Sequence, residues 1–238
     1  MKHFSTVYNR KRIIFFTILI SFSLWLFWGI PLPTKLSSPN IPVSTKLFDR
    51  NGKLIYEIYA GTRRSPVDLD DLPDYIKNST ISIEDKDFYK HYGFSFSGIA
   101  RSIYKIVTRG KIEGGSTLTQ QLVKNALLTP ERTIRRKVRE FFLTMVVEGI
   151  YSKNQILEMY LNQIPYGSTA YGIESASELY FGKSAKDLTL AEATLIAGLP
   201  QSPTRYSPFG AHPELAKERQ KEVLVQMVKN GYISQEEA

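Results

Sequence analysis

The sequence contains no cysteine and only three histidines among its 238 residues. The missing cysteines exclude disulfides, thiolate zinc sites and cysteine nucleophiles. His3, His91 and His212 have none of the spacings of a metalloprotease motif. The net charge of +8 includes no long basic run, so nothing favours nucleic acid as a partner. Any chemistry must therefore use carboxylates, hydroxyls, amides and cations.

One long apolar run, Ile13 to Ile30, has 18 residues without a charge. As a helix it would be about 27 Å long, enough to span a bilayer with flanking help. Four basic residues and no acid precede it, which favours a cytoplasmic N-terminus. The alternative is a cleaved signal peptide, but the run exceeds the usual ~7–15 residues and no small-x-small site follows it. We therefore predict a cytoplasmic tail at 1–12, a transmembrane anchor at 13–30 and an extended, proline-rich linker at 31–43.

A β-hairpin is predicted directly after the linker. Two alternating runs, Ser44–Asp49 and Lys53–Tyr59, flank the dipeptide Asn51-Gly52. Asn-Gly between such runs is a strong hairpin signal, because both residues accept the positive φ of a tight turn.

From about residue 70 the signals are helical. Capping boxes at Ser152 and Thr189 begin apolar helices, and Thr129 before Pro130 predicts a further helix start. Residues 44–238 are thus predicted to form one domain, which is all-α apart from the small hairpin at its N-terminal end. Ser234 to Glu237 looks like the cap of one more helix, so we expect the chain to be truncated from a longer protein.

The first segment whose side chains could take part in catalysis runs from Glu84 to Gly93 (EDKDFYKHYG). A carboxylate beside aromatic surface loses water, which raises its pKa and suits a general base at neutral pH. Taken alone, the segment is better explained as a solvated charged turn.

The second segment, Gly114 to Gln121, leads into a helix that carries Lys124. Ser116 is placed to cap this helix, and Thr117, Gln121 and Lys124 would share one polar stripe. A helix N-terminus with a nearby lysine can hold an anion. An ordinary glycine-containing cap remains the alternative.

The third segment, residues 131–140, is rich in arginine. Its periodicity predicts a buried stripe of Ile134, Val138, Phe141 and Met145. Arg132, Arg136 and Glu140 would lie four apart on the opposite face. By itself this pattern fits a solvated face with ion pairs.

Together these segments resemble glycosyltransferase family 51, the peptidoglycan glycosyltransferases. EDKDFYKHYG, GGSTLTQQ and RKVRE are similar to its first three motifs, in order. YLNQIPYGSTAYGIESASELYFGK and LTLAEATLIAGLPQSPTRYSP are similar to the last two regions. The likeness covers about residues 44–235. Pro165 and Thr169 depart from the commonest pattern, which leaves the local loop geometry open.

The resemblance implies a lysozyme-like bilobed helical domain that polymerises lipid II. Transfer would be inverting, from a donor linked to undecaprenyl pyrophosphate to the 4-hydroxyl of the acceptor sugar. It implies Glu84 as the general base and Glu140 as a second essential carboxylate. Lys124, Arg132, Arg136 and Lys137 would hold the pyrophosphate. Further substrate-binding positions carried over are Asp85, Phe88, His91, Ser116, Thr117, Gln121, Asn125 and Asn162.

The same resemblance implies no organic cofactor and no metal-ligating residue, although Mg²⁺ or Mn²⁺ assists the pyrophosphate in some members. The expected partners are lipid II, the growing glycan strand, the bilayer and other cell-wall synthesis proteins, at the bacterial cytoplasmic membrane. One alternative is a lytic transglycosylase or hydrolase of the same fold, which would need no pyrophosphate cations. The other is an inactive glycan-binding scaffold, which would be expected to have lost Glu84 or Glu140.

Overall fold

The computed structural model describes residues 2–36, 45–51, 54–58, 63–95 and 115–238. Helices dominate the described chain, and strands are few and short. In chain order the α-helices are α1 (Lys2–Phe27), α2 (Asp74–Glu84), α4 (Leu118–Ala126), α5 (Ile134–Ile150), α6 (Lys153–Gln163), α7 (Ile173–Phe181), α8 (Leu190–Ala197) and α9 (Pro213–Lys229). The short 3₁₀ helices are η1 (Pro33–Leu36), η2 (Leu69–Asp71), η3 (Phe88–Lys90) and η4 (Ala185–Asp187). The strands are β1 (Thr45–Phe48), β2 (Leu54–Ile58), β3 (Arg63–Arg64), β4 (Pro165–Gly167) and β5 (Ala170–Tyr171).

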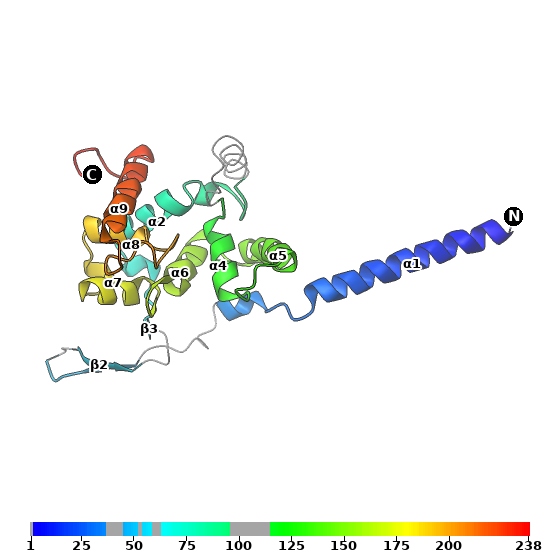
Figure 1. Ribbon diagram of the computed structural model, residues 1–238, viewed down its shortest axis with the longest axis horizontal. Helices are drawn as coiled ribbons and strands as arrows, with labels where there is room; N and C mark the ends of the chain where they lie inside the picture. The colour runs from blue at the N-terminus through cyan, green and yellow to red at the C-terminus, as the bar shows by residue number, and fades with distance from the viewer. Residues whose placement is uncertain (1, 37–44, 52–53, 59–62, 96–114) are drawn as a thin grey trace.

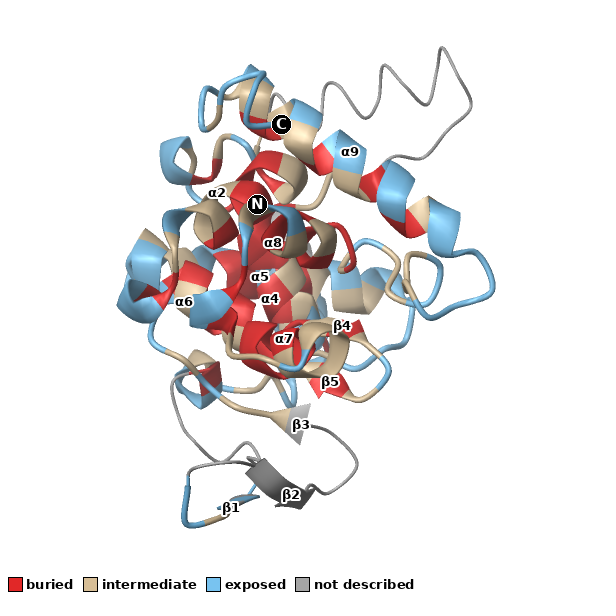
Figure 2. Cartoon of the chain, turned by 90° about the vertical axis from the view of Figure 1, so that its left-hand side faces the viewer, coloured by how far each residue is buried: buried red, intermediate tan, exposed pale blue. Residues whose placement is uncertain are grey.

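The helices α2 and α4 to α9 form one body, from which α1 extends as a separate rod (Figure 1). Within the body α2 packs on α8 and α9, and α4 packs on α5 and α6. Figure 2 shows the buried residues gathered along α4 and α8 in the middle of this body. Its largest fully buried side chains include Phe88, Ile76, Leu118, Leu122, Ile156, Tyr160, Tyr166 and Ile173.

The predicted hairpin is confirmed: β1 and β2 pair antiparallel, with Thr45 opposite Ile58. Before the turn, the Asp49 carboxylate accepts a hydrogen bond of 2.8 Å from the Asn51 amide. A second, three-stranded sheet in the order β3-β5-β4 was not predicted. Its parallel pair joins Arg63 to Ala170, residues far apart in the sequence, so no local pattern indicates it.

Part of the predicted linker is packed on the body. Residues 33–36 form η1 rather than an extended spacer, and Leu36 is buried. The Gln163 amide donates to the Leu36 carbonyl at 3.1 Å, and the Tyr151 hydroxyl donates to the Pro33 carbonyl at 3.2 Å. Residues 37–43 lie outside the described part of the chain.

The helix caps show where local sequence decides the fold. The capping boxes at Ser152 and Thr189 are confirmed, and each side chain accepts from the backbone three residues on. The helix start predicted at Thr129-Pro130 is wrong, because α5 begins at Ile134 with Thr133 as its cap. Thr133 rather than Thr129 caps α5, because the Thr133 hydroxyl accepts a hydrogen bond of 3.1 Å from the Arg136 amide.

The predicted buried stripe of α5 is also wrong. Ile134 is 86% exposed, Phe141 and Met145 are exposed, and Val138 is half-buried. The buried positions are instead Glu140, Leu143, Thr144 and Val147. Glu140 and Thr144 on this inner face form polar interactions, while the large apolar side chains of α5 lie on its outer face. Part of that outer face meets α1, where Phe27 packs edge-on against Phe142 with ring centroids 5.0 Å apart.

Two arginines of α5 bind the C-terminal end of α1. Arg135 donates to the Trp25 carbonyl and lies 4.6 Å over the Trp25 ring. Arg139 donates to the carbonyls of Leu26 at 2.7 Å and Trp28 at 2.5 Å. These bonds satisfy carbonyls that a helix end leaves open. In the described chain no helix combines the length and the apolar character needed to cross a membrane, so the anchor at 13–30 stays a prediction.

Candidate active site

Glu84 is the last residue of α2, and its side chain is 8% exposed. Its Oε2 accepts a hydrogen bond of 2.6 Å from Nε2 of Gln121 on α4. The other end of this amide, Oε1 of Gln121, accepts from the Tyr160 hydroxyl of α6 at 3.4 Å. Tyr160 therefore orients the Gln121 amide so that its N–H faces the carboxylate. Three helices fix the position of Glu84 in this way.

Burial raises the pKa of Glu84 above its ordinary value of 4.5. The hydrogen bond from Gln121 and the charges of Arg219 and Lys124 oppose this rise, and Asp85 adds to it. Burial likewise raises the pKa of the Tyr160 phenol, and the Glu84 charge raises it further. A carboxylate held in this environment takes up a proton more readily than an exposed one, as a general base requires.

A second buried carboxylate, Glu140 of α5, also interacts electrostatically with Lys124. Burial lowers the pKa of Lys124, while the charges of Glu140 and Glu84 raise it and those of Arg136 and Lys137 lower it. These couplings place all five side chains in one electrostatic cluster. Glu140 is 2% exposed and forms an ion pair with Lys137. Among the described residues, Oε1 of Glu84 and Oε2 of Glu140 have no hydrogen-bond partner.

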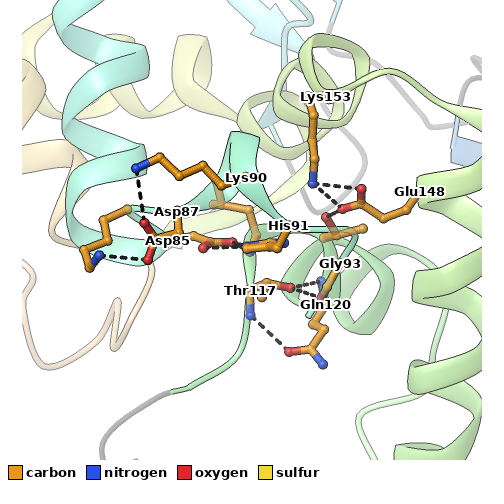
Figure 3. A network of polar contacts seen from close by, with 12 residues as sticks. Asp85, Asp87, Lys90, His91, Gly93, Thr117, Gln120, Glu148 and Lys153 are labelled. Carbon is orange, nitrogen blue, oxygen red and sulfur yellow. Dashed lines mark hydrogen bonds and ion pairs between the residues drawn. The ribbon is translucent and has the colours of Figure 1, made fainter. Parts of the chain in front are cut away.

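The segment after Glu84 ties α2 to the start of α4 (Figure 3). Asp85 accepts from the Leu118 amide at 3.1 Å and lies 2.9 Å from Nε2 of His91. Thr117 caps α4 and donates to the Gly93 carbonyl at 2.7 Å. Gly93 has φ of +79°, and a Cβ there would lie 2.6 Å from the Thr144 methyl group. Glycine is thus required for α5 to approach this loop.

We expect Asp85→Ala to lower the free energy of unfolding by about 1–3 kcal/mol. The change leaves the buried Leu118 amide and the His91 ring without their acceptor, and unpaired buried groups cost this much. Urea denaturation of both proteins measures the effect. Asp187→Ala, at an exposed aspartate, is the control and should change stability by less than about 0.5 kcal/mol. Equal stability of the two variants would contradict the structural role of Asp85.

Behind this segment lies a network that the sequence did not predict (Figure 3). The side chain of Glu148 on α5 is 4% exposed, and it accepts from Lys153 at 2.9 Å and from the Thr119 hydroxyl. The Lys153 ammonium also lies 4.5 Å over the ring of Phe88. The network joins α4, α5 and α6 behind the site, where it supports the helices that carry Gln121 and Glu140.

The remaining predicted residues lie in several environments. Phe88 is fully buried, and Thr117 is the cap of α4 rather than part of its polar stripe, so the cap predicted at Ser116 is one residue off. The Asn162 amide binds both main-chain polar groups of Val67, at 2.8 and 2.9 Å. Asn125 and Arg132 are exposed. Direct substrate contact by the predicted set stays a prediction, and Gly114 lies outside the described residues.

Sequence reasoning did not connect three buried residues with Glu84: Tyr160, Tyr166 and Arg219. Tyr160 and Tyr166 belong to a recognised motif region, but nothing in their spacing indicates contact with the carboxylate. Arg219 is 8% exposed on α9, and its Nη2 lies 4.0 Å from Oε1 of Glu84. The sequence did offer one signal, which is that Arg219 lies on the apolar side of an amphipathic helix. Because arginine is rarely buried without a partner, this position indicates a buried acidic group nearby.

No group of three or more histidine, aspartate or glutamate side chains in the described chain is placed to hold a metal ion. A divalent cation at the pyrophosphate stays a prediction.

The model of the family described as Transglycosylase matches residues 51–228, which include the whole site. The chain belongs to the transglycosylase family. A transglycosylase domain is a glycosyltransferase, so the predicted family and enzyme class are confirmed.

Relatives of this transglycosylase chain are much longer proteins. It is 43% identical over 196 residues to penicillin-binding protein 1F of Bacillus subtilis (strain 168), covering 82% of this chain and 27% of the relative. It is 40% identical over 223 residues to penicillin-binding protein 1A of Aquifex aeolicus (strain VF5), covering 93% and 30%. A crystal structure of penicillin-binding protein 1A from Haemophilus influenzae matches with a TM-score of 0.46 and 28% identity, covering 82% of this chain and 19% of that chain. The chain thus spans less than a third of the length of these relatives.

Proposed function

We propose that this chain is a peptidoglycan glycosyltransferase that polymerises lipid II. The observation that carries the proposal is the pair of buried carboxylates, Glu84 and Glu140, whose charges both act on the partly buried Lys124. One carboxylate suits a proton acceptor, and the cations beside the other suit a diphosphate leaving group. The names of the relatives, which are penicillin-binding proteins, support a role in the cell wall.

In the proposed reaction Glu84 accepts the proton of the acceptor 4-hydroxyl while that oxygen attacks the anomeric carbon of the donor. The bond from this carbon to the diphosphate oxygen breaks, and the diphosphate leaves with the electron pair. Lys124 and Arg136 stabilise the developing negative charge through charge-assisted hydrogen bonds. Attack from the face opposite the leaving group inverts the anomeric centre, through an oxocarbenium-like transition state.

A hydrolase of the same fold is the alternative to exclude. The purified chain should be given lipid II and, separately, a preformed glycan strand that carries no pyrophosphate. The proposal predicts longer strands from lipid II and no shortening of the preformed strand. Shortening of the preformed strand, with no polymer from lipid II, would establish the hydrolase and overturn the proposal.

We further propose that the protein works at the bacterial cytoplasmic membrane, with α1 as its anchor. The run at 13–30 supports this, as does the exposed apolar side of α5 next to the end of α1. That side includes Phe141, Phe142, Met145, Val146 and Ile150. Contiguous exposed apolar surface of this kind marks a contact with a partner or a membrane. Other cell-wall synthesis proteins remain expected partners.

The proposed topology predicts that protease added to intact spheroplasts degrades everything beyond Pro31. The basic residues before Ile13 should keep residues 1–12 in the cytoplasm. An antibody epitope at the N-terminus should therefore survive in intact spheroplasts and be lost after permeabilisation, which is the control. Protection of the catalytic body in intact spheroplasts would contradict the topology and the access to lipid II.

A further inference from the structure

Arg219 is the one arginine that the described ion pairs connect with Glu84, and none of the recognised motifs contains it. Its side chain is 10% exposed, and its Nη2 lies 4.0 Å from Oε1 of Glu84. This oxygen is the one that Gln121 does not bind, and among the described residues it has no hydrogen-bond partner. The two oxygens of the carboxylate thus have different neighbours, an amide donor on α4 and a guanidinium on α9.

The position of Arg219 is fixed from three sides. Its Nη1 donates to Glu222 at 2.7 Å, and its guanidinium lies 5.7 Å from the centre of the Tyr206 ring. Its stem crosses Gly198 at the end of α8, where an added Cβ would lie 2.8 Å from Cγ of Arg219. The absence of a side chain at residue 198 therefore lets the guanidinium reach the carboxylate from α9.

We propose that Arg219 is a positioning residue of the active site, which holds the Oε1 side of the Glu84 carboxylate in place for the acceptor hydroxyl. The inference deepens the proposed function and rests on Glu84 being its general base. The separation of 4.0 Å exceeds a hydrogen bond, so Arg219 acts through its charge and leaves the Oε1 lone pairs open. An arginine in direct contact would occupy the lone pair that must take the proton.

Several other groups near Glu84 also influence its pKa. Lys124 on α4 and Arg219 on α9 favour the ionised form, and Asp85 disfavours it. Tyr160 of α6 and Tyr166 of β4 contribute buried phenols, whose pKa values are raised by burial and by the Glu84 charge. Burial is the largest influence on Glu84 and raises its pKa, so Arg219 offsets part of the cost of burying the charge.

The test measures the protonation of Glu84 without substrate. Arg219→Met keeps the stem that packs on Gly198 and removes the charge. Selective ¹³C labelling of glutamate carboxyls gives the titration midpoint of Glu84 in the full chain, and the Glu84→Gln variant identifies its signal. We expect Arg219→Met to raise this midpoint by about one pH unit, because an opposite charge at this distance shifts a pKa by roughly 1–3 units. Arg219→Lys, which keeps a charge, should restore at least half of the shift.

Lys221→Gln is the matched control, since it removes one positive charge from an exposed position on the same helix. It should leave the midpoint unchanged. If Arg219→Met does not fold, Arg219→Gln replaces it with the same expected shift. An unchanged Glu84 midpoint in the variant would overturn the proposal and leave Arg219 a packing residue of α9.

In a plot of polymerisation rate against pH, the acidic limb for Arg219→Met should move to higher pH by the same amount as the Glu84 titration midpoint. A purely structural role would lower the rate at all pH values and leave the limb in place. Because the titration needs no lipid II, it separates the two proposals. A shifted midpoint in a chain that does not polymerise would contradict the proposed function and retain the contact with Arg219.

Discussion

Glu84→Gln is expected to lower the rate of lipid II polymerisation by about 10²–10⁴-fold, the usual contribution of a general base. The glutamine side chain keeps the shape of the carboxylate and an oxygen that can accept from Gln121, so the site should stay folded. Lipid II affinity should change by less than about threefold, because the base acts on the transition state more than on the ground state. Single-turnover rates and equilibrium binding measure the two effects separately.

Glu174→Gln is a suitable control for this variant. Glu174 is also a buried carboxylate, and it accepts from the Ala185 amide at 2.8 Å on the α7 side of the body. Its neutral replacement should affect stability and leave polymerisation within about twofold of wild type. If Glu84→Gln polymerises within tenfold of wild type, Glu84 is not the base.

Lys124→Ala is expected to slow polymerisation by about 10–100-fold. One charge-assisted hydrogen bond to the leaving diphosphate contributes about 1.5–3 kcal/mol in a partly dry site. The control is Lys186→Ala, at an exposed lysine of η4, which should leave the rate unchanged. A near wild-type rate for Lys124→Ala would show that the diphosphate is held elsewhere.

A double-mutant cycle then identifies the partner of Lys124. The sequence predicted that Arg132 joins Lys124 at the diphosphate, but Arg132 is exposed in the segment before α5. Arg136 is the arginine whose charge reaches Lys124 in the structure. We therefore expect a larger coupling free energy for Lys124 with Arg136 than with Arg132, measured on kcat/KM. The reverse order would favour the sequence prediction.

Glu84 and the partly buried Lys124 also predict a narrow pH profile. Glu84 must be ionised, and burial raises its pKa, so activity is lost as pH falls toward a value above the ordinary 4.5. Lys124 must be charged, and burial lowers its pKa, so activity is lost as pH rises toward a value below the ordinary 10.5. Both limbs of kcat/KM against pH should lie closer to neutrality than those of exposed side chains.

Local signals in the sequence predicted local structure correctly where one interaction decides it. The boxes at Ser152 and Thr189 and the antiparallel pairing of β1 with β2 each depend on bonds between residues that are close in the sequence. The start of α5 failed because two caps competed, and Thr133 provides an actual acceptor for the Arg136 amide. The pairing of Arg63 with Ala170 depends on tertiary packing, which no short pattern contains.

The candidate site shows the same limit. The motifs predicted Glu84, Gln121, Lys124 and Glu140, and the structure brings these residues together. Periodicity placed the apolar side of α5 inward, but the inner face is occupied by Glu140 and Thr144, which have polar surroundings there. The tertiary arrangement alone brings Arg219 next to Glu84. The division into two lobes stays a prediction, since residues 96–114 lie outside the described chain.

The most direct test of the central claim is a reaction of the purified full chain with labelled lipid II and no other protein, with the products separated on a gel. We expect a ladder of glycan polymer from the wild-type chain and no polymer from Glu84→Gln in parallel. A wild-type chain that binds lipid II and forms no polymer, or a ladder of equal intensity from Glu84→Gln, would contradict it.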